Sequence, residues 1–169
     1  MKDKRGLLVD RTDIDQRPAI VEEKNRIGDL EIDLVIGKNH KGALITINDR
    51  ATGILYMDKV ESKEARVIQA KTIELLQDWK PILKTITSDN GKEFANHKAI
   101  AHELEIDFYF AKPYDSWERG ANENLNGLIR QYFPKKTDFR LIEKSETERV
   151  INILNNRRQR PTAQEKIWI

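Results

Sequence analysis

The stretch LEIDLVIG (residues 30–37) alternates apolar and acidic side chains and then becomes wholly apolar, as the sequence of a buried β-strand does. KNHKG (38–42) follows, with the Asn and Gly residues that are typical of a hairpin loop. Two more strand-like stretches come next, ALITIND (43–49) and GILYMDKV (53–60). Three consecutive strands with short connections predict an antiparallel meander, and the rest of the fold is built outward from it.

After the meander the chain alternates helical and strand-like stretches. Apolar residues from Val67 to Trp79 repeat at helical spacing, so we expect an amphipathic helix over 63–78. Val67 and Trp79 are the first and last residues of its expected apolar stripe. We then expect a strand over 82–88, a helix over 95–105, a strand over 106–111 and two final helices that contain Leu125 and Leu154. This order predicts an α/β (α+β) protein with a five-stranded mixed sheet flanked by helices.

The length of 169 residues favours a single folded domain. We divide the chain into an N-terminal arm or linker over 1–27, a core over 28–160 and a tail over 161–169. No apolar stretch approaches the roughly 18 residues that a transmembrane helix needs, and the N-terminus lacks the apolar segment of a secretory signal. We therefore expect a cytoplasmic protein with no membrane partner.

Composition excludes several kinds of site. The chain has no Cys, which rules out disulfides, thiol nucleophiles and Cys-based metal sites. Its three His (His40, His97 and His102) are too few and too scattered for a convincing zinc site. The net charge is only +2, but residues 119–160 contain ten basic and five acidic residues. This surplus could neutralise phosphates or could simply solvate a helical face.

Three acidic residues stand out by their positions. Asp33 interrupts an apolar strand, where an unpaired carboxylate would be costly. Asp89 follows a predicted strand, and ligands collect at the carboxyl ends of strands in open sheets. Glu123 lies at the start of a predicted helix, on its polar face. Each also has an ordinary explanation: an edge-facing strand acid, a turn former in Asp-Asn-Gly, and an acid favoured by the helix dipole.

Together, these acids and the residues around them resemble the catalytic core of the retroviral-integrase superfamily, which has a ribonuclease-H-like fold. Within it, the chain most resembles the IS-thirty family of bacterial insertion-sequence transposases. The motifs that carry the resemblance are LEIDLVIGKNHKGALITINDRATG (30–53), TSDNGKEF (87–94), FAKPYDSWERGANENLNGLIRQYFPK (110–135) and LNNR (154–157). Several long motifs in the right order are a far more specific signal than one short pattern.

The resemblance implies that Asp33, Asp89 and Glu123 form an Asp-Asp-Glu triad that holds two Mg²⁺ ions when DNA is bound, with Mn²⁺ able to substitute. Carboxylate oxygens are the ligands that such hard cations prefer. It further implies cleavage that frees 3′ ends of DNA, followed by strand transfer. The implied partners are element ends and target DNA, the implied assembly is a homodimer or higher oligomer, and the implied place is the bacterial nucleoid.

Candidate DNA contacts follow from position and from the resemblance. Basic residues can reach phosphates, amides beside Glu123 can bond a carboxylate or a phosphate, and aromatic residues in the preceding loop can stack on an unpaired base. These candidates are Lys92, Tyr114, Trp117, Arg119, Asn122, Asn126, Arg130, Lys135 and Lys136.

Three departures from the family pattern are visible. Near the end, Asn155, Asn156 and Arg157 are followed by Arg158, Gln159 and Arg160 in place of the continuation usual in relatives. The loop at 114–118 lacks the proline usual in relatives and gains negative charge, and residues 1–30 lack the helix-turn-helix pattern of the family's DNA-reading region. We therefore expect a catalytic fragment. Two alternatives stay open at this point: a ribonuclease-H-like nuclease without joining activity, and a decayed, non-catalytic DNA-binding module.

Overall fold

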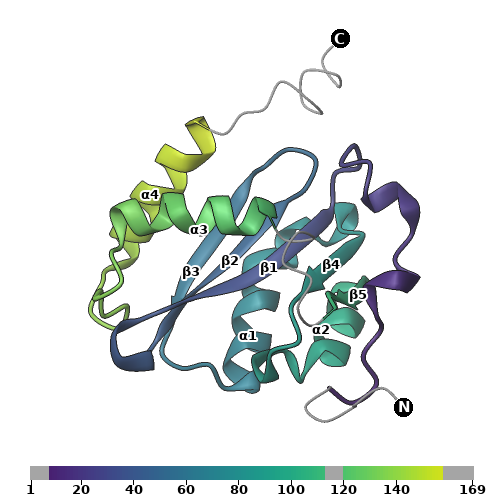
Figure 1. The fold of residues 1–169 in the computed structure, drawn as a ribbon, viewed down its shortest axis with the longest axis horizontal. Helices are drawn as coiled ribbons and strands as arrows, with labels where there is room; N and C mark the ends of the chain where they lie inside the picture. The colour runs from purple at the N-terminus through teal and green to yellow at the C-terminus, as the bar shows by residue number, and fades with distance from the viewer. Residues whose placement is uncertain (1–7, 113–119, 158–169) are drawn as a thin grey trace.

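The computed structural model describes residues 8–112 and 120–157, with residues 120–123 described by their backbone alone. At its centre is a five-stranded sheet in the order β3-β2-β1-β4-β5 (Figure 1). The strands are β1 (Asp29–Ile36), β2 (Ala43–Asp49), β3 (Leu55–Val60), β4 (Thr85–Ser88) and β5 (Asp107–Phe110). The first three form the antiparallel meander, and β4 and β5 continue the sheet in parallel with β1. The predicted mixed five-stranded sheet is confirmed.

Two pairs of helices cover the two faces of this sheet. They are α1 (Ala65–Leu76) and α2 (His97–Leu104) on one face, and α3 (Gly120–Tyr132) and α4 (Lys144–Arg157) on the other (Figure 1). Alternation along β1 divides the core: Leu34 packs in the α1/α2 cluster and Val35 in the α3/α4 cluster. Asp33 therefore shares the α3/α4 face with Val35. This layered arrangement is the ribonuclease-H-like fold.

The strand expected over 82–88 begins three residues late, at Thr85. The 3-10 helix Gln77–Ile82 continues directly from α1, and the Leu83 N–H closes it by donating to the Lys80 carbonyl at 3.3 Å. Pairing with β1 therefore starts at Thr85. Trp79 lies in this 3-10 helix with 45% of its surface exposed, so its expected place on the apolar stripe of α1 was wrong. Its ring instead packs on Tyr56, with the ring centroids 5.9 Å apart.

The described part of the N-terminal arm, residues 8–27, is irregular as expected, but it lies against the sheet. Two 3-10 turns, Ile14–Gln16 and Ala19–Val21, each bury one apolar side chain. The Arg17 guanidinium donates to Thr87 Oγ1 of β4 at 2.9 Å, and the Phe110 N–H of β5 donates to the Thr12 carbonyl. The arm therefore docks onto the parallel half of the sheet.

A buried network of ion pairs fixes this docking. Arg50, just after β2, pairs with Glu31 of β1, and both side chains are at least nine-tenths buried. Arg50 also donates to the Val21 carbonyl at 3.2 Å, and Glu22 of the arm pairs with Arg17. A buried charge is tolerated only when its partners are present, so the arm, β1 and the turn after β2 depend on one another.

We expect Arg50→Met to lower the free energy of unfolding by about 3–5 kcal/mol, because it leaves Glu31 as a buried, uncompensated carboxylate. Urea denaturation followed by circular dichroism measures this change. Arg66→Met is the matched control: its side chain is 78% exposed and pairs with Glu64 on the surface, so about 0–1 kcal/mol is expected. Equal losses in the two variants would contradict a structural role for the buried network.

Candidate active site

Asp33 lies in the middle of β1 and points to the α3/α4 face, where it is half-buried. Its Oδ1 accepts the N–H of Leu34 at 2.8 Å, and its Oδ2 accepts a hydrogen bond from Asn126 Nδ2 at 3.2 Å. Asn126 belongs to α3, so the contact joins β1 to the helix that crosses it. The sequence places Asp33 here because the alternation of β1 gives its odd-numbered residues this face.

Asp89 follows β4 directly and lies beside Asp33. In the parallel pairing of β1 with β4, the last pair is Glu31 with Thr87. Asp33 lies two residues beyond it in β1, and Asp89 lies two residues beyond it in the other chain segment, directly after the end of β4. Asp89 Oδ1 accepts the N–H of Gly91 at 3.0 Å, which holds the carboxylate in the Asp-Asn-Gly turn. Parallel pairing thus joins two acids that are 56 residues apart in the sequence.

Glu123 belongs to α3, one helical turn before Asn126, and its side chain lies outside the described part of the structure. The helix is attached to β1 at two points. Asn126 bonds Asp33, and Arg130 Nη2 donates to the Ile36 carbonyl at 2.8 Å. The backbone at position 123 therefore has a fixed place one turn from the contact with Asp33.

The predicted DNA-contact residues fall into three groups. Lys92, Lys135 and Lys136 are exposed to solvent. Asn126 and Arg130 are half-buried and occupied by contacts with β1 and the end of α3. Tyr114, Trp117 and Arg119 lie outside the described residues, as does the side chain of Asn122.

The donors around Asp33 and Asp89 fit a hard divalent cation. Mg²⁺ uses one or two protein carboxylates and completes its shell with water and phosphate oxygens. Beside these two carboxylates, Asn126 Oδ1 is buried without a hydrogen-bond partner, which leaves an oxygen donor unused. Among the side chains that the structure describes, those of residues 8–112 and 124–157, no three His, Asp or Glu stand close enough together to hold a metal ion. The two described acids and Asn126 are thus oxygen donors of the kind that such an ion would use.

Glu93 is a further acid at this place that sequence reasoning did not single out. Burial, and after it repulsion from the Asp89 and Asp33 carboxylates, raises the pKa of Glu93 from its ordinary value. A hydrogen bond to the backbone N–H of Glu93 and the charge of Lys63 act in the opposite direction. The motif SDNGKEF contains this residue four positions after Asp89. Spacing alone gave no sign that its side chain folds back toward Asp89.

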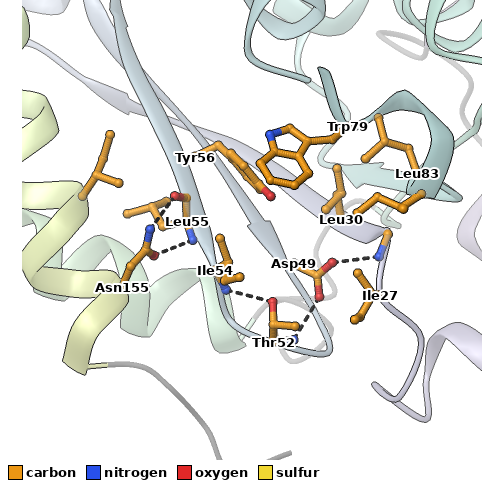
Figure 2. Close-up of a pocket in the computed structure, with 13 residues that line it drawn as sticks. Ile27, Leu30, Asp49, Thr52, Ile54, Leu55, Tyr56, Trp79, Leu83 and Asn155 are labelled. Atoms are coloured by element: carbon orange, nitrogen blue, oxygen red, sulfur yellow. Dashed lines mark hydrogen bonds between the residues drawn. The ribbon is translucent and has the colours of Figure 1, made fainter. Parts of the chain in front are cut away.

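A separate pocket of about 560 Å³ opens at the other end of β1 (Figure 2). Its walls are mostly apolar, and two of its polar side chains hold local backbone. Asp49 accepts N–H bonds from Gly28, Ala51 and Thr52, and the Asn155 amide bonds both the N–H and the carbonyl of Leu55. These polar groups close the turn between β2 and β3 and dock α4, so they offer little to a polar ligand.

Comparison with known proteins gives relatives of one kind. The chain is 57% identical over 153 residues to the transposase for insertion sequence element IS4351 of Bacteroides fragilis, a match that covers 90% of this chain and 47% of that protein. It is 37% identical over 160 residues to the transposase InsI for insertion sequence element IS30C of Escherichia coli, covering 92% and 41%. A putative integrase, ORF3 of Spiroplasma virus SpV1-R8A2 B, is 28% identical over 157 residues, covering 92% and 48%. No protein-family model matches the chain.

The chain is a relative of the insertion-sequence transposases. The resemblance to an integrase-type core close to the IS-thirty family is thereby confirmed. The chain spans about half the length of the transposases that it matches. No helix in the described ranges is long and apolar enough to cross a membrane.

Arg130→Met should lower the free energy of unfolding by about 1.5–3 kcal/mol, because it removes the charged donor that bonds the Ile36 carbonyl. The methionine keeps most of the aliphatic stem, so packing changes little. Arg149→Met on the exposed side of α4 is the control and should change stability by less than about 0.5 kcal/mol. Chemical denaturation of both variants measures the free energy of unfolding. If Arg130→Met loses no more of this free energy than Arg149→Met, then Arg130 does not attach α3 to β1.

Proposed function

We propose that this chain is the catalytic core of a DDE-type transposase, in which Asp33, Asp89 and Glu123 hold two Mg²⁺ ions at the reacting phosphate. The observation that carries the proposal is the register of two adjacent parallel strands: Asp33 and Asp89 each lie two residues beyond the pair Glu31–Thr87, and α3 is attached to Asp33 itself. The transposase relatives support the same conclusion, since their matches extend over about nine-tenths of the chain.

The chemistry of such a site is displacement at phosphorus. Two divalent ions activate the attacking oxygen and stabilise the leaving one when they are bound. Water first attacks the phosphodiester at an element end, and the bond to O3′ breaks to release a 3′-hydroxyl. That hydroxyl then attacks a target phosphodiester, with loss of the target's own O3′. The two steps use one site with different nucleophiles.

The described residues contribute by holding the carboxylates in place before substrate arrives. Asn126 fixes Asp33 Oδ2 from α3, and the Gly91 N–H fixes Asp89 Oδ1 from its own turn. Arg130 holds α3 on the end of β1, and thus the backbone that carries Glu123. Because charge on the phosphoryl oxygens must be met by preorganised groups, this rigidity contributes directly to the rate.

An exposed basic surface beyond the carboxyl end of β1 supports DNA as the partner. It consists of Lys38, Lys41, Lys135, Lys136 and Arg140. The loop after β1 and the loop after α3 meet there, since the Lys38 N–H donates to the Thr137 carbonyl at 2.9 Å. Two acids lie near Arg140. Asp138 is paired with it at 2.7 Å, which holds the pKa of Asp138 down to about 2, and the charge of Glu61 adds to that of Asp138 in raising the pKa of Arg140. This surface extends the lysines predicted from the sequence, and we propose that it binds phosphates of element-end or target DNA.

Asp89→Asn should abolish divalent-dependent nicking and joining while the fold stays intact, because an amide is a poor Mg²⁺ ligand. Nicking of a supercoiled plasmid in Mg²⁺ or Mn²⁺ measures the first step, and a donor with a free 3′-hydroxyl measures the second. Asp107→Asn, at an exposed position of β5, is the matched control and should keep full activity. Activity in Asp89→Asn would remove the residue from the site, and nicking by the parent without joining would favour the nuclease alternative.

Lys135→Ala combined with Lys136→Ala should weaken DNA binding about equally for all sequences and reduce the salt slope of the association constant by up to about two units. Fluorescence anisotropy at several salt concentrations measures both effects. Lys84→Ala combined with Lys98→Ala removes two exposed lysines elsewhere on the molecule and is expected to leave the slope unchanged. If the two double variants behave alike, the basic surface serves only to solvate the end of α3.

A further inference from the structure

The turn that carries Asp89 also carries a second carboxylate, that of Glu93. After Asp89 the chain enters the 3-10 helix Lys92–Phe94, and Phe94 is fully buried in the α1/α2 core. This anchor directs the neighbouring Glu93 side chain back over the turn, where it is half-buried. Its carboxylate is therefore held by the fold and does not extend into solvent.

Gly91 provides the space that the Glu93 carboxylate occupies. A Cβ at position 91 would lie 2.2 Å from Glu93 Oε1 and 2.4 Å from Oε2, so the carboxylate covers the Cα of this glycine. The N–H of the same Gly91 donates to Asp89 Oδ1 at 3.0 Å. One glycine thus contacts both carboxylates. Its φ of −72° is open to any residue, so the glycine is needed here for space and not for backbone conformation.

We propose that Glu93 is a positioning residue of the active site, whose carboxylate over Gly91 strengthens the binding of divalent cations by Asp89 and Asp33 through its charge. The inference rests on the proposed function. Glu93 acts at a distance from the ion, because the described residues include no three acids close enough to share one metal. The geometry supports this, because the Glu93 carboxylate lies against the same Gly91 whose N–H holds Asp89. Repulsion from Asp89 and Asp33 adds to burial in raising the pKa of Glu93.

Removing the charge should weaken metal binding by a predictable amount. At solvent-like dielectric constants and separations of several ångströms, one unit charge changes the affinity for a divalent ion roughly three- to tenfold. Glu93→Gln, which keeps the shape of the side chain, should therefore raise the Kd for Mn²⁺ by this factor. Glu93→Asp, which keeps the charge, should retain more of the affinity than Glu93→Gln.

The experiment titrates Mn²⁺ into the protein and follows the free ion by electron paramagnetic resonance, with thermal melts of the same variants in EDTA. Asp89→Asn defines the site, and Glu103→Gln on the exposed side of α2 is the matched control. In EDTA, Glu93→Gln should melt at or above the wild-type temperature because repulsion is relieved. An unchanged Kd in Glu93→Gln, or an equal loss in Glu93→Asp and Glu93→Gln, would overturn the proposal.

Gly91→Ala tests the geometry independently. The new Cβ would displace the flexible end of Glu93 while the N–H to Asp89 remains, so the Kd for Mn²⁺ should rise about as much as in Glu93→Gln. The double variant should be no weaker than either single one, because both remove the same contribution. Additive losses would overturn the link between the two residues. If the wild type does not bind Mn²⁺, or binds it just as tightly after Asp89→Asn, the proposed function itself is contradicted, and this inference with it.

Discussion

The parallel pairing of β1 with β4 is the constraint on which the rest of the molecule depends. It extends over three pairs of residues, from Asp29 with Thr85 to Glu31 with Thr87. Asp33 and Asp89 each lie two residues beyond the last pair. At the last pair itself, Arg17 of the arm donates a hydrogen bond to Thr87. A slip of one residue would turn every side chain of one strand to the opposite face and separate the two acids. Register therefore fixes the chemistry as well as the fold.

Local patterns were sufficient to predict most of the fold. The meander could be read from alternation and turn residues, and Ile100 and Leu104 lie in the core as their spacing indicates. The errors arise where tertiary contacts override a local pattern. Ile82 looks like the start of a strand, yet the chain there closes the 3-10 helix around Pro81 and leaves this side chain 43% exposed. No local pattern marks such a boundary, because pairing with β1 decides it.

The candidate site also contains residues that the sequence indicates and residues that only the folded structure reveals. Asp33 and Asp89 stood out from 28 acidic residues by position, one inside a strand and one directly after a strand, and the resemblance to the integrase superfamily then grouped them into one expected site. Glu93 did not stand out, since its importance comes from the space over Gly91, which only the folded turn reveals. Arg130 shows the opposite case: a basic residue on a polar helix face suggests a phosphate contact, but the Ile36 carbonyl receives its guanidinium. Burial lowers the pKa of this arginine, as expected for a side chain that serves as a structural tie.

The arrangement around Asp33 keeps polar groups in a state that folding alone would not favour. Within the described residues, two buried side-chain atoms lack a hydrogen-bond partner, Glu31 Oε2 and Asn126 Oδ1, and both residues lie on the face of the sheet or helix that carries Asp33. Repulsion from Asp33 and Asp89 adds to burial in raising the pKa of Glu93. Unsatisfied oxygens and gathered like charges destabilise a fold unless a cation neutralises them. Glu31 uses one carboxylate oxygen in its ion pair with Arg50 and leaves the other unsatisfied, so the unmet oxygens begin beside the buried ion pairs and continue to Asn126 at Asp33. The proposed binding of divalent ions would relieve part of this cost.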